Sequence, residues 1–162
     1  MQVSDTTLEG VKLISLAVSE DHRGRYIELF NAQWFQEHVA PISFVQDDVS
    51  ISRYDVLRGI HGDAVTYKLI SCPYGLIYLV IVDIKKQTWQ SFMLNGGSQV
   101  LVPPGDGVAH LVLSDWAVFH YKQSTYYHPE LQFSYRYDDP RFKIAWPTEN
   151  PILSRRDENG GS

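Results

Sequence analysis

Cysteine is nearly absent from this chain of 162 residues, which carries Cys72 alone. One cysteine cannot close an intrachain disulfide, and it cannot build a thiolate zinc site. Long hydrophobic runs are missing as well, and the N-terminal stretch MQVSDTTLEG lacks the basic and apolar regions of a signal peptide. These absences predict no membrane span and favour a reducing compartment, so we expect a cytoplasmic protein.

Several glycine-containing motifs are also missing. The sequence has neither the P-loop nor the dinucleotide-binding turn, and it has no Gly-x-Ser-x-Gly nucleophile elbow. An excess of basic residues is lacking too, because the formal net charge is −5. That charge excludes general binding to nucleic acids, which requires a basic surface. If the ligand is an anion, a local cluster of Arg and Lys must hold it against the charge of the whole protein.

The composition is otherwise typical of one globular domain, with 44% apolar and 20% charged residues. Aromatic residues reach 13%, which suits β-strands and also sites that stack sugars or bases. The length fits one domain with its own core. We therefore expect a single domain over residues 1–162. The polar chain after Leu153 is expected to fray, with a flexible tail over about residues 158–162.

Short apolar runs bounded by turn residues recur along the chain. Evenly spaced runs of this kind predict an all-β antiparallel sandwich or barrel, of which the jelly roll is one form. One run, LIYLVIVDI, is apolar on both faces, which predicts a central strand covered on both sides. The expected strands are Val11–Val18, Tyr26–Phe30, Ile42–Ser52, Val56–His61, Tyr67–Cys72, Leu76–Ile84, Trp89–Leu94, Gln99–Val102, Gly107–Leu113 and Ala117–Gln123.

One short helix is predicted over Ala32–His38. Asn31 is a suitable N-cap for it, and Trp34 and Phe35 would pack inward. The chain beyond this segment shows no helical period. We therefore expect one or two short peripheral helices in all.

The run Leu57-Arg58-Gly59-Ile60-His61 contains the first candidate site residues. In a flat strand Arg58 and His61 would point to opposite faces, whereas a bulge at Gly59 would bring both to one face. Lys68 follows a Gly-Asp turn and would lie near His61 if the two flanking strands pair. The alternative is structural: an Arg beside a turn, a core His, and a Lys with its head in water.

A second set of candidates comes from strand alternation. Phe119, Tyr121 and Gln123 share one face of their strand, so Tyr121 faces the interior if Phe119 does. By the same alternation His110 looks inward. The alternative for Tyr121 is a core phenol with a hydrogen-bond partner. Asp157 lies near the polar end of the chain, where composition alone favours a solvated carboxylate.

A metal site is not indicated by the histidines. Metal-binding cupins usually supply a close His-x-His pair and an acid, and no His-x-His occurs in this sequence. His61 and His110 with one carboxylate leave a facial triad open as the alternative. We expect no metal.

These residues lie in stretches that keep the order of a known family. From about residue 10 to 157 the chain resembles the dTDP-4-dehydrorhamnose 3,5-epimerases. No single motif is decisive, but this many matches in the order of the family are together specific. The matching stretches are Asp21-His22-Arg23-Gly24-Arg25-Tyr26-Ile27-Glu28, Phe44-Val45-Gln46-Asp47, Val56-Leu57-Arg58-Gly59-Ile60-His61, Tyr67-Lys68-Leu69, Pro103-Pro104-Gly105, Ala109-His110, Tyr121-Lys122, Tyr126-Tyr127-His128-Pro129, Asp138-Asp139-Pro140, Ile144-Ala145-Trp146-Pro147 and Leu153-Ser154 to Asp157.

The resemblance implies a metal-free, cupin-type jelly-roll sandwich that needs no cofactor, forms a homodimer and epimerises a nucleotide-activated 4-keto sugar. It implies that His61 is the general base, with Asp157 as its orienting partner. Tyr121 would be the acid on the opposite face, and Lys68 would support the enolate oxygen. The implied substrate-binding residues are Arg23, Glu28, Gln46 and Arg58 at the nucleotide and pyrophosphate, Tyr127 near the base or sugar, and His110.

The chemistry is consistent with these roles. A C4 ketone acidifies the hydrogens at C3 and C5, because the carbanion delocalises into an enolate. Removing such a proton needs a base poised near neutral pH, and histidine has an unperturbed pKa of about 6.5. Inversion needs a proton donor on the other face, which a phenol can be. Bidentate Arg contacts would hold the pyrophosphate.

The sequence also departs from the family pattern. Those enzymes usually carry an aromatic residue and a Gln after the histidine, where Gly62 and Asp63 stand here. Asp48 replaces a common Asn, and Leu111 replaces a common Gly. The Arg-Gly-Ile-His-Gly-Asp run is similar to a branch that acts on GDP-activated 4-keto-6-deoxy-heptoses in capsule or O-antigen synthesis. The nucleotide, the sugar and the inverted carbons therefore stay open.

Three other function classes remain as alternatives. A sugar-nucleotide 3,4-ketoisomerase would also move protons through an enediol. A metal-dependent cupin oxygenase would carry iron or manganese. A non-catalytic sugar-nucleotide binding module would bind tightly without turnover.

Overall fold

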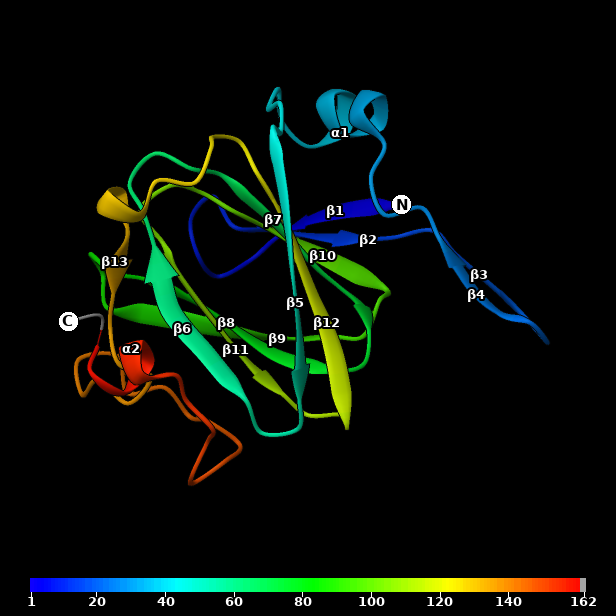
Figure 1. The fold of residues 1–162 in the computed structure, drawn as a ribbon. Coiled ribbons are helices and arrows are strands. Elements are labelled where there is room, and N and C mark those ends of the chain that lie inside the picture. The colour runs from blue at the N-terminus through cyan, green and yellow to red at the C-terminus, as the bar shows by residue number, and fades with distance from the viewer. Residues whose placement is uncertain (161–162) are drawn as a thin grey trace.

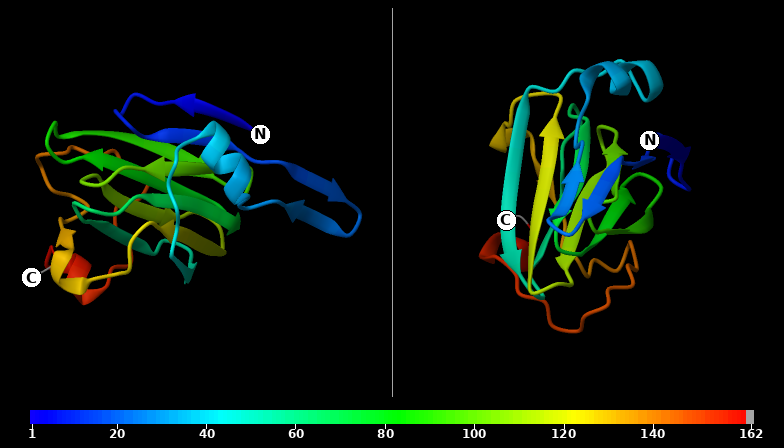
Figure 2. Two further views of the ribbon diagram at one scale, coloured as in Figure 1. Left: turned by 90° about the horizontal axis from the view of Figure 1, so that it is seen from above. Right: turned by 90° about the vertical axis from the view of Figure 1, so that its right-hand side faces the viewer.

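The computed structural model of the protein describes residues 1–160 and shows a sandwich of two antiparallel β-sheets (Figures 1 and 2). This confirms the predicted all-β jelly-roll type of fold with short peripheral helices. The strands are β1 (Gln2–Asp5), β2 (Lys12–Ser15), β3 (Val18–Asp21), β4 (Gly24–Ile27), β5 (Gln46–Arg53), β6 (Leu57–Gly62), β7 (Lys68–Tyr74), β8 (Ile77–Asp83), β9 (Thr88–Leu94), β10 (Ser98–Val102), β11 (Gly107–Val112), β12 (Trp116–Gln123) and β13 (Phe133–Ser134). The helices are α1 (Ala32–His38), the 3₁₀ turn η1 (Pro129–Leu131) and α2 (Arg155–Glu158).

The two sheets divide the candidate residues between them. One sheet has the strand order β1-β2-β10-β7-β12-β5, and the other has the order β13-β6-β11-β8-β9. Strands β3 and β4 form a separate hairpin that projects away from the sandwich (Figure 1). The strands that carry Lys68 and Tyr121 therefore belong to one layer, and the strand that carries His61 belongs to the other.

The main hydrophobic core fills the space between the sheets. Strand β8 shows how the sequence specifies this packing, because its alternate residues enter two different clusters. Ile77, Leu79 and Ile81 face the main core, while Val80 and Val82 face a second cluster on the outside of their sheet, around Phe142. The central, doubly covered strand predicted from its continuous apolar run is therefore confirmed.

Helix α1 lies at the top of the molecule in Figure 1 and packs against residues on the outer face of the six-stranded sheet. It spans the predicted residues, and the Asn31 side chain accepts a hydrogen bond from the backbone N–H of Trp34, as an N-cap does. Phe35 is buried against Ile14 and Leu69 of the sheet. Burial of this one face fixes the helix, which is too short to be stable alone.

Strand β6 carries the predicted irregularity. His61 pairs with Val108 and Arg58 pairs with His110, so Gly59 and Ile60 together lie opposite Ala109 alone. This is a β-bulge, the second of the two arrangements that the sequence left open, and it turns Arg58 and His61 to one side. The Gly59–Ile60 peptide bond is cis.

The ends of the chain differ from the sequence prediction. The strand expected over residues 11–18 is two strands, because β2 pairs with β1 and β10 whereas β3 leaves the sheet and pairs with β4. The expectation that the chain frays after Leu153 is wrong for residues 155–158, which form α2. The last part of the expected tail, residues 161–162, lies outside the described residues. No helix described in residues 1–160 has the length and hydrophobicity to cross a membrane.

Candidate active site

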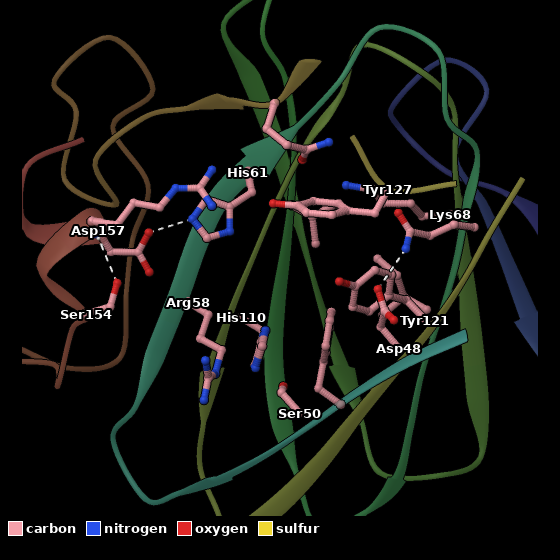
Figure 3. Close-up of a pocket in the computed structure, with 16 residues that line it drawn as sticks. Asp48, Ser50, Arg58, His61, Lys68, His110, Tyr121, Tyr127, Ser154 and Asp157 are labelled. Atoms are coloured by element: carbon pink, nitrogen blue, oxygen red, sulfur yellow. Dashed lines mark hydrogen bonds and ion pairs between the residues drawn. The ribbon is translucent and has the colours of Figure 1, made fainter. Parts of the chain in front are cut away.

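A cavity of about 390 Å³ opens between the two sheets at one end of the main core (Figure 3). Its walls come from β6 and β11 on one side and from β5, β7 and β12 on the other, and the chain after β12 and helix α2 complete it. The lining residues are Asp48, Ser50, Arg58, His61, Lys68, Ile70, Val108, His110, Phe119, Tyr121, Gln123, Tyr127, Gln132, Ser154, Arg156 and Asp157.

His61 and Asp157 form a hydrogen-bonded pair on one side of this cavity. Nε2 of His61 lies 2.6 Å from Oδ1 of Asp157. A carboxylate can only accept a hydrogen bond, so Nε2 carries the proton and donates it. The other ring nitrogen, Nδ1, is then an acceptor, and it points into the cavity (Figure 3). An orienting acid behind a histidine is the arrangement of a general base.

Helix α2 places Asp157 where it can do this. The Ser154 hydroxyl caps the helix by accepting from the backbone N–H of Asp157. The carboxylate is 3% exposed and its Oδ2 accepts from the backbone N–H of Gly59. Burial works to raise the pKa of Asp157, but the hydrogen bond and charge of His61 outweigh it, so the pKa lies below its usual value. The composition-based expectation of a solvated carboxylate is therefore wrong. Helix α2 packs against the bulge of β6, and this contact buries Asp157.

Tyr121 lies on the opposite side of the cavity, on β12 (Figure 3). The predicted alternation is confirmed, since Phe119, Tyr121 and Gln123 all line the cavity. Burial, and then the negative charge of Asp48, raises the pKa of Tyr121 to about 12. The phenol therefore stays protonated at neutral pH and can act as a proton donor.

Lys68 is buried in the same wall as Tyr121, on β7, with an exposure of 9%. The condition under which the sequence would bring Lys68 near His61, pairing of their two strands, is not met, because β6 and β7 belong to different sheets. Lys68 and His61 instead line the same cavity from its two opposite walls. Burial lowers the pKa of Lys68, and the charge of Asp63 partly opposes this effect. No hydrogen bond joins its ammonium group to any residue within 1–160, which leaves the group available to a ligand.

His110 looks into the cavity, as strand alternation predicts. Its ring stacks on Phe119 with 3.9 Å between the centroids, and Nε2 has no hydrogen-bond partner among the described residues. Burial, with repulsion from Arg58 and His61, lowers the pKa of His110 to about 3. The ring is therefore neutral, and a polar ligand would meet a hydrogen-bonding nitrogen that the protein leaves unpaired.

The charge of the cavity differs from that of the protein. Arg58, Lys68 and Arg156 contribute three cationic groups, whereas Asp48 and Asp157 contribute two carboxylates. The cavity therefore has a local positive excess within a chain of net charge −5. This is the local cationic cluster that an anionic ligand would need.

The remaining predicted substrate-binding residues fall into two groups. Gln46 does not line the cavity but contacts two residues that do: its amide donates to Asp48 and its carbonyl accepts from the backbone N–H of Tyr127. Arg23 and Glu28 do not line the cavity of their own chain. Arg23 is paired with Asp21 at the tip of the projecting β3–β4 hairpin. The structure of one chain therefore does not bring these two residues to the others.

Several cavity residues escaped the sequence analysis. Arg156, Gln132 and Ser50 carry no motif of their own, and only the tertiary fold brings their separate segments to the cavity. The signal that could have found Arg156 is its place beside Asp157 in the matched Leu153-to-Asp157 stretch. Over residues 1–160, no group of three or more His, Cys, Asp or Glu side chains is placed to hold a metal ion.

The chain is similar in sequence and fold to known proteins over almost its whole length. A family model described as dTDP-4-dehydrorhamnose 3,5-epimerase matches residues 5–162. The enzyme of that name from Escherichia coli K12 is 39% identical, over 98% of this chain and 92% of the relative. A dTDP-6-deoxy-D-glucose-3,5-epimerase from Legionella pneumophila, solved in complex with dTDP-4-keto-L-rhamnose, superposes with a TM-score of 0.90 at 34% identity, covering 98% of this chain and 90% of the other.

A further solved relative carries two substitutions. It is a double mutant of a 3'-monoepimerase from Streptomyces bikiniensis in complex with dTDP, with one histidine changed to asparagine and one tyrosine to phenylalanine. Its TM-score is 0.88 at 30% identity, covering 96% of this chain and 84% of the other. With a family model that spans almost the whole sequence, these likenesses show that the chain belongs to the dTDP-4-dehydrorhamnose 3,5-epimerase family and is an isomerase.

Proposed function

We propose that the protein epimerises C3, C5 or both of a nucleotide-activated 4-keto-6-deoxy sugar, with His61 as base and Tyr121 as acid. The observation that carries the proposal is the placement of His61 on one sheet, hydrogen-bonded to Asp157 of helix α2, and of Tyr121 on the other sheet, around one cavity. A sugar ring held between the two walls presents opposite faces to the two groups, as inversion at carbon requires.

The first step is removal of a proton from the carbon next to the ketone. Nδ1 of His61 accepts it, and the imidazolium that forms is stabilised by the ionised Asp157 2.6 Å from Nε2. The electron pair moves into the C4 carbonyl and gives an enolate. The ammonium group of Lys68 is the cation that we assign to the enolate oxygen, where such a group contributes about 3 kcal/mol to the transition state.

The second step is return of a proton to the other face. Tyr121 donates it, because the pKa of about 12 keeps the phenol protonated until the basic enolate forms. The tyrosinate that remains is reprotonated from solvent, and His61 loses its proton to solvent. The reaction then balances with no cofactor and no metal.

The diphosphate of the nucleotide is assigned to the part of the site around the Arg58 guanidinium. Arg58 lines the cavity with its guanidinium held by the Ser52 hydroxyl at 3.0 Å. Next to it, His110 presents its unpaired ring nitrogen. Tyr127 is 42% exposed at the mouth, where its ring is free to stack on the base or sugar. Gln46 supports Tyr127 from behind.

The names of the relatives favour dTDP as the nucleotide. A GDP-linked 4-keto-6-deoxy-heptose is the second candidate, since Gly62 and Asp63 depart from the family pattern beside the base. Either product is a deoxy sugar of the kind used in capsule or lipopolysaccharide synthesis.

We also assign the protein to a homodimer. The β3–β4 hairpin projects from the sandwich (Figures 1 and 2). Arg23 lies in its turn and Glu28 directly follows β4, and neither residue lines the cavity of its own chain. If these residues contact the nucleotide, as the family resemblance implies, they must do so in a second copy. Each site then takes its base and acid from one chain and Arg23 from the other.

The proposal is tested by incubation in heavy water with dTDP-linked and GDP-linked 4-keto-6-deoxy sugars, read by mass spectrometry and NMR. Deuterium at C3 or C5 with inversion supports the proposal. A shifted ketone indicates a 3,4-ketoisomerase instead, and tight binding without exchange indicates a binding module. Either of those outcomes, or no exchange with any of the sugars, overturns the proposal.

A further inference from the structure

Asp63 is a buried carboxylate at the edge of the cavity, two residues after His61. It is 5% exposed and accepts three hydrogen bonds. Its Oδ1 takes the backbone N–H groups of Val65 and Thr66 at 2.9 and 2.7 Å, and its Oδ2 takes the side-chain amide of Gln132 at 3.0 Å. Burial works to raise the pKa of Asp63, but these hydrogen bonds outweigh it and keep the group ionised at neutral pH.

The ionised carboxylate determines how Gln132 is oriented. Because it can only accept, the NH₂ group of Gln132 must face Asp63. The other end of the amide, Oε1, receives no hydrogen bond from any residue in the described part of the chain, and the side chain lines the cavity. Asp63 therefore holds Gln132 so that its Oε1 atom, which can only accept a hydrogen bond, is the amide atom available to a ligand in the cavity.

The position of Gln132 indicates which part of a ligand it meets. It directly precedes β13, whose Phe133 pairs with Gly62 and whose Ser134 pairs with His61. The segments approach so closely that a Cβ atom on Gly62 would lie 2.4 Å from the Phe133 ring. Gln132 is thereby held on the His61 side of the cavity, the side on which the proposed function places proton removal from the sugar. A pyrophosphate offers acceptors only, so an acceptor at this place suits a sugar hydroxyl.

We propose that Asp63 is a positioning residue that presents Gln132 as an acceptor to a hydroxyl of the substrate sugar, and that the pair contributes to the choice of sugar. This inference rests on the proposed function. It also assigns a role to the two residues that depart from the family pattern. Gly62 leaves room for the Phe133 ring, and Asp63 orients Gln132.

The test is a pair of reversed substitutions. Asp63→Asn keeps an oxygen for Val65 and Thr66 but places an amide donor against Gln132, which turns its NH₂ group into the cavity. Gln132→Glu sets two carboxylates against each other. The double variant restores one donor facing one carboxylate, and the carboxylate introduced by Gln132→Glu again offers an acceptor to the cavity. Each single variant is expected to raise KM for a dTDP-linked 4-keto-6-deoxy-hexose about 10-fold or more, and the double variant to recover most of the loss.

Two further measurements separate this role from a structural one. Thermal unfolding and the Kd for dTDP alone are measured for each variant, with Asp115→Asn, an exposed carboxylate in the β11–β12 turn, as the matched control. We expect the Kd for dTDP to stay within about twofold of wild type while KM for the sugar nucleotide rises. Gln132→Met, which leaves Asp63 in place, should raise KM in the same way and covers the case in which Asp63→Asn does not fold.

The outcomes are distinct. An unchanged KM in Gln132→Met, equal weakening of dTDP and of the sugar nucleotide, or a double variant no better than its parents each overturns the inference. In all of these cases the wild-type enzyme still exchanges deuterium. Absence of exchange in the wild type would overturn the proposed function instead.

Discussion

Gly59 packs so tightly against the neighbouring strand that a Cβ atom on it would lie 2.3 Å from the carbonyl oxygen of Val108. Its φ of +107° is also one that residues with a side chain rarely adopt. The bulge that carries Arg58 and His61 into one cavity is built on this residue. Two functional side chains are thus positioned by a residue that has none.

The first prediction follows from this contact. Gly59→Ala is expected to lower the free energy of unfolding by about 2 kcal/mol or more, because the backbone of β11 must move. Gly105→Ala is the matched control: its φ is +92°, but nothing lies within 4 Å of the added atom, so about 1 kcal/mol is expected. Urea unfolding of both variants measures the difference. Equal losses would contradict the argument from close packing.

The second prediction concerns the base. His61→Asn removes the proton acceptor, and Asp157→Asn keeps a side chain of the same shape but removes the charge that stabilises the imidazolium. Both are expected to lower kcat for epimerisation by about 100-fold or more. Circular dichroism and thermal unfolding establish that each variant is folded. Wild-type rates in both folded variants would show that another group takes the proton.

The third prediction separates the two proton transfers. Tyr121→Phe removes the donor on the far wall but leaves His61 and Asp157 intact. We expect deuterium from solvent still to enter the sugar with retention, while the inverted product falls by about 10²- to 10⁴-fold. Mass spectrometry measures uptake, and NMR measures configuration. If uptake and inversion fall together, Tyr121 is needed for the first step as well.

The fourth prediction uses the buried His110. The pKa of His110 is about 3 in the folded protein, below the ordinary value of 6.5 in the unfolded chain. As pH falls from about 6.5 toward 3, the unfolded chain binds a proton that the folded protein does not, so folding loses up to a few kcal/mol. His110→Phe removes this term, and its urea stability should fall less than that of wild type between pH 7 and pH 4. A substitution at the exposed His22 is the control, and it should not change the dependence of urea stability on pH. Parallel curves for His110→Phe would show that the ring is not held neutral.

The fifth prediction tests the shared site. Arg23→Ala and His61→Asn are each expected to be weakly active alone. In a one-to-one mixture that exchanges subunits, each mixed dimer contains one site with both native residues, so about a quarter of the wild-type sites return. Activity after mixing is the measurement, with size-exclusion chromatography to establish the dimer. No recovery despite subunit exchange would place Arg23 outside the partner's site.

The sequence predicted the sandwich and the helix, and it offered the bulge as one of two possibilities, because each depends on local patterns. Alternation fixes which face of β12 carries Tyr121, and Gly59 marks the bulge within its own strand. The continuous apolar run of β8 indicates two covered faces. These features needed no knowledge of which strands are neighbours.

The sequence could not predict what depends on pairing between distant segments. Whether the strands of His61 and Lys68 pair cannot be read from local pattern, and the structure places them in different sheets. Asp157 lies in a polar stretch and becomes buried only because α2 packs beside β6. Gln132 and Arg156 gain their roles in the same way, from a loop and a helix that reach the cavity after the strands have formed.

The division of base and acid between two sheets has a consequence for how the enzyme can be tuned. The gap between the two proton-transfer groups depends on the spacing of the two sheets, whose backbones lie about 10 Å apart in sandwiches of this kind with a layer of side chains between them. Ile70, Val108 and Phe119 belong both to that layer and to the cavity wall. A methyl group gained or lost among them changes the spacing across the sugar ring, so turnover is coupled to hydrophobic packing by the architecture itself.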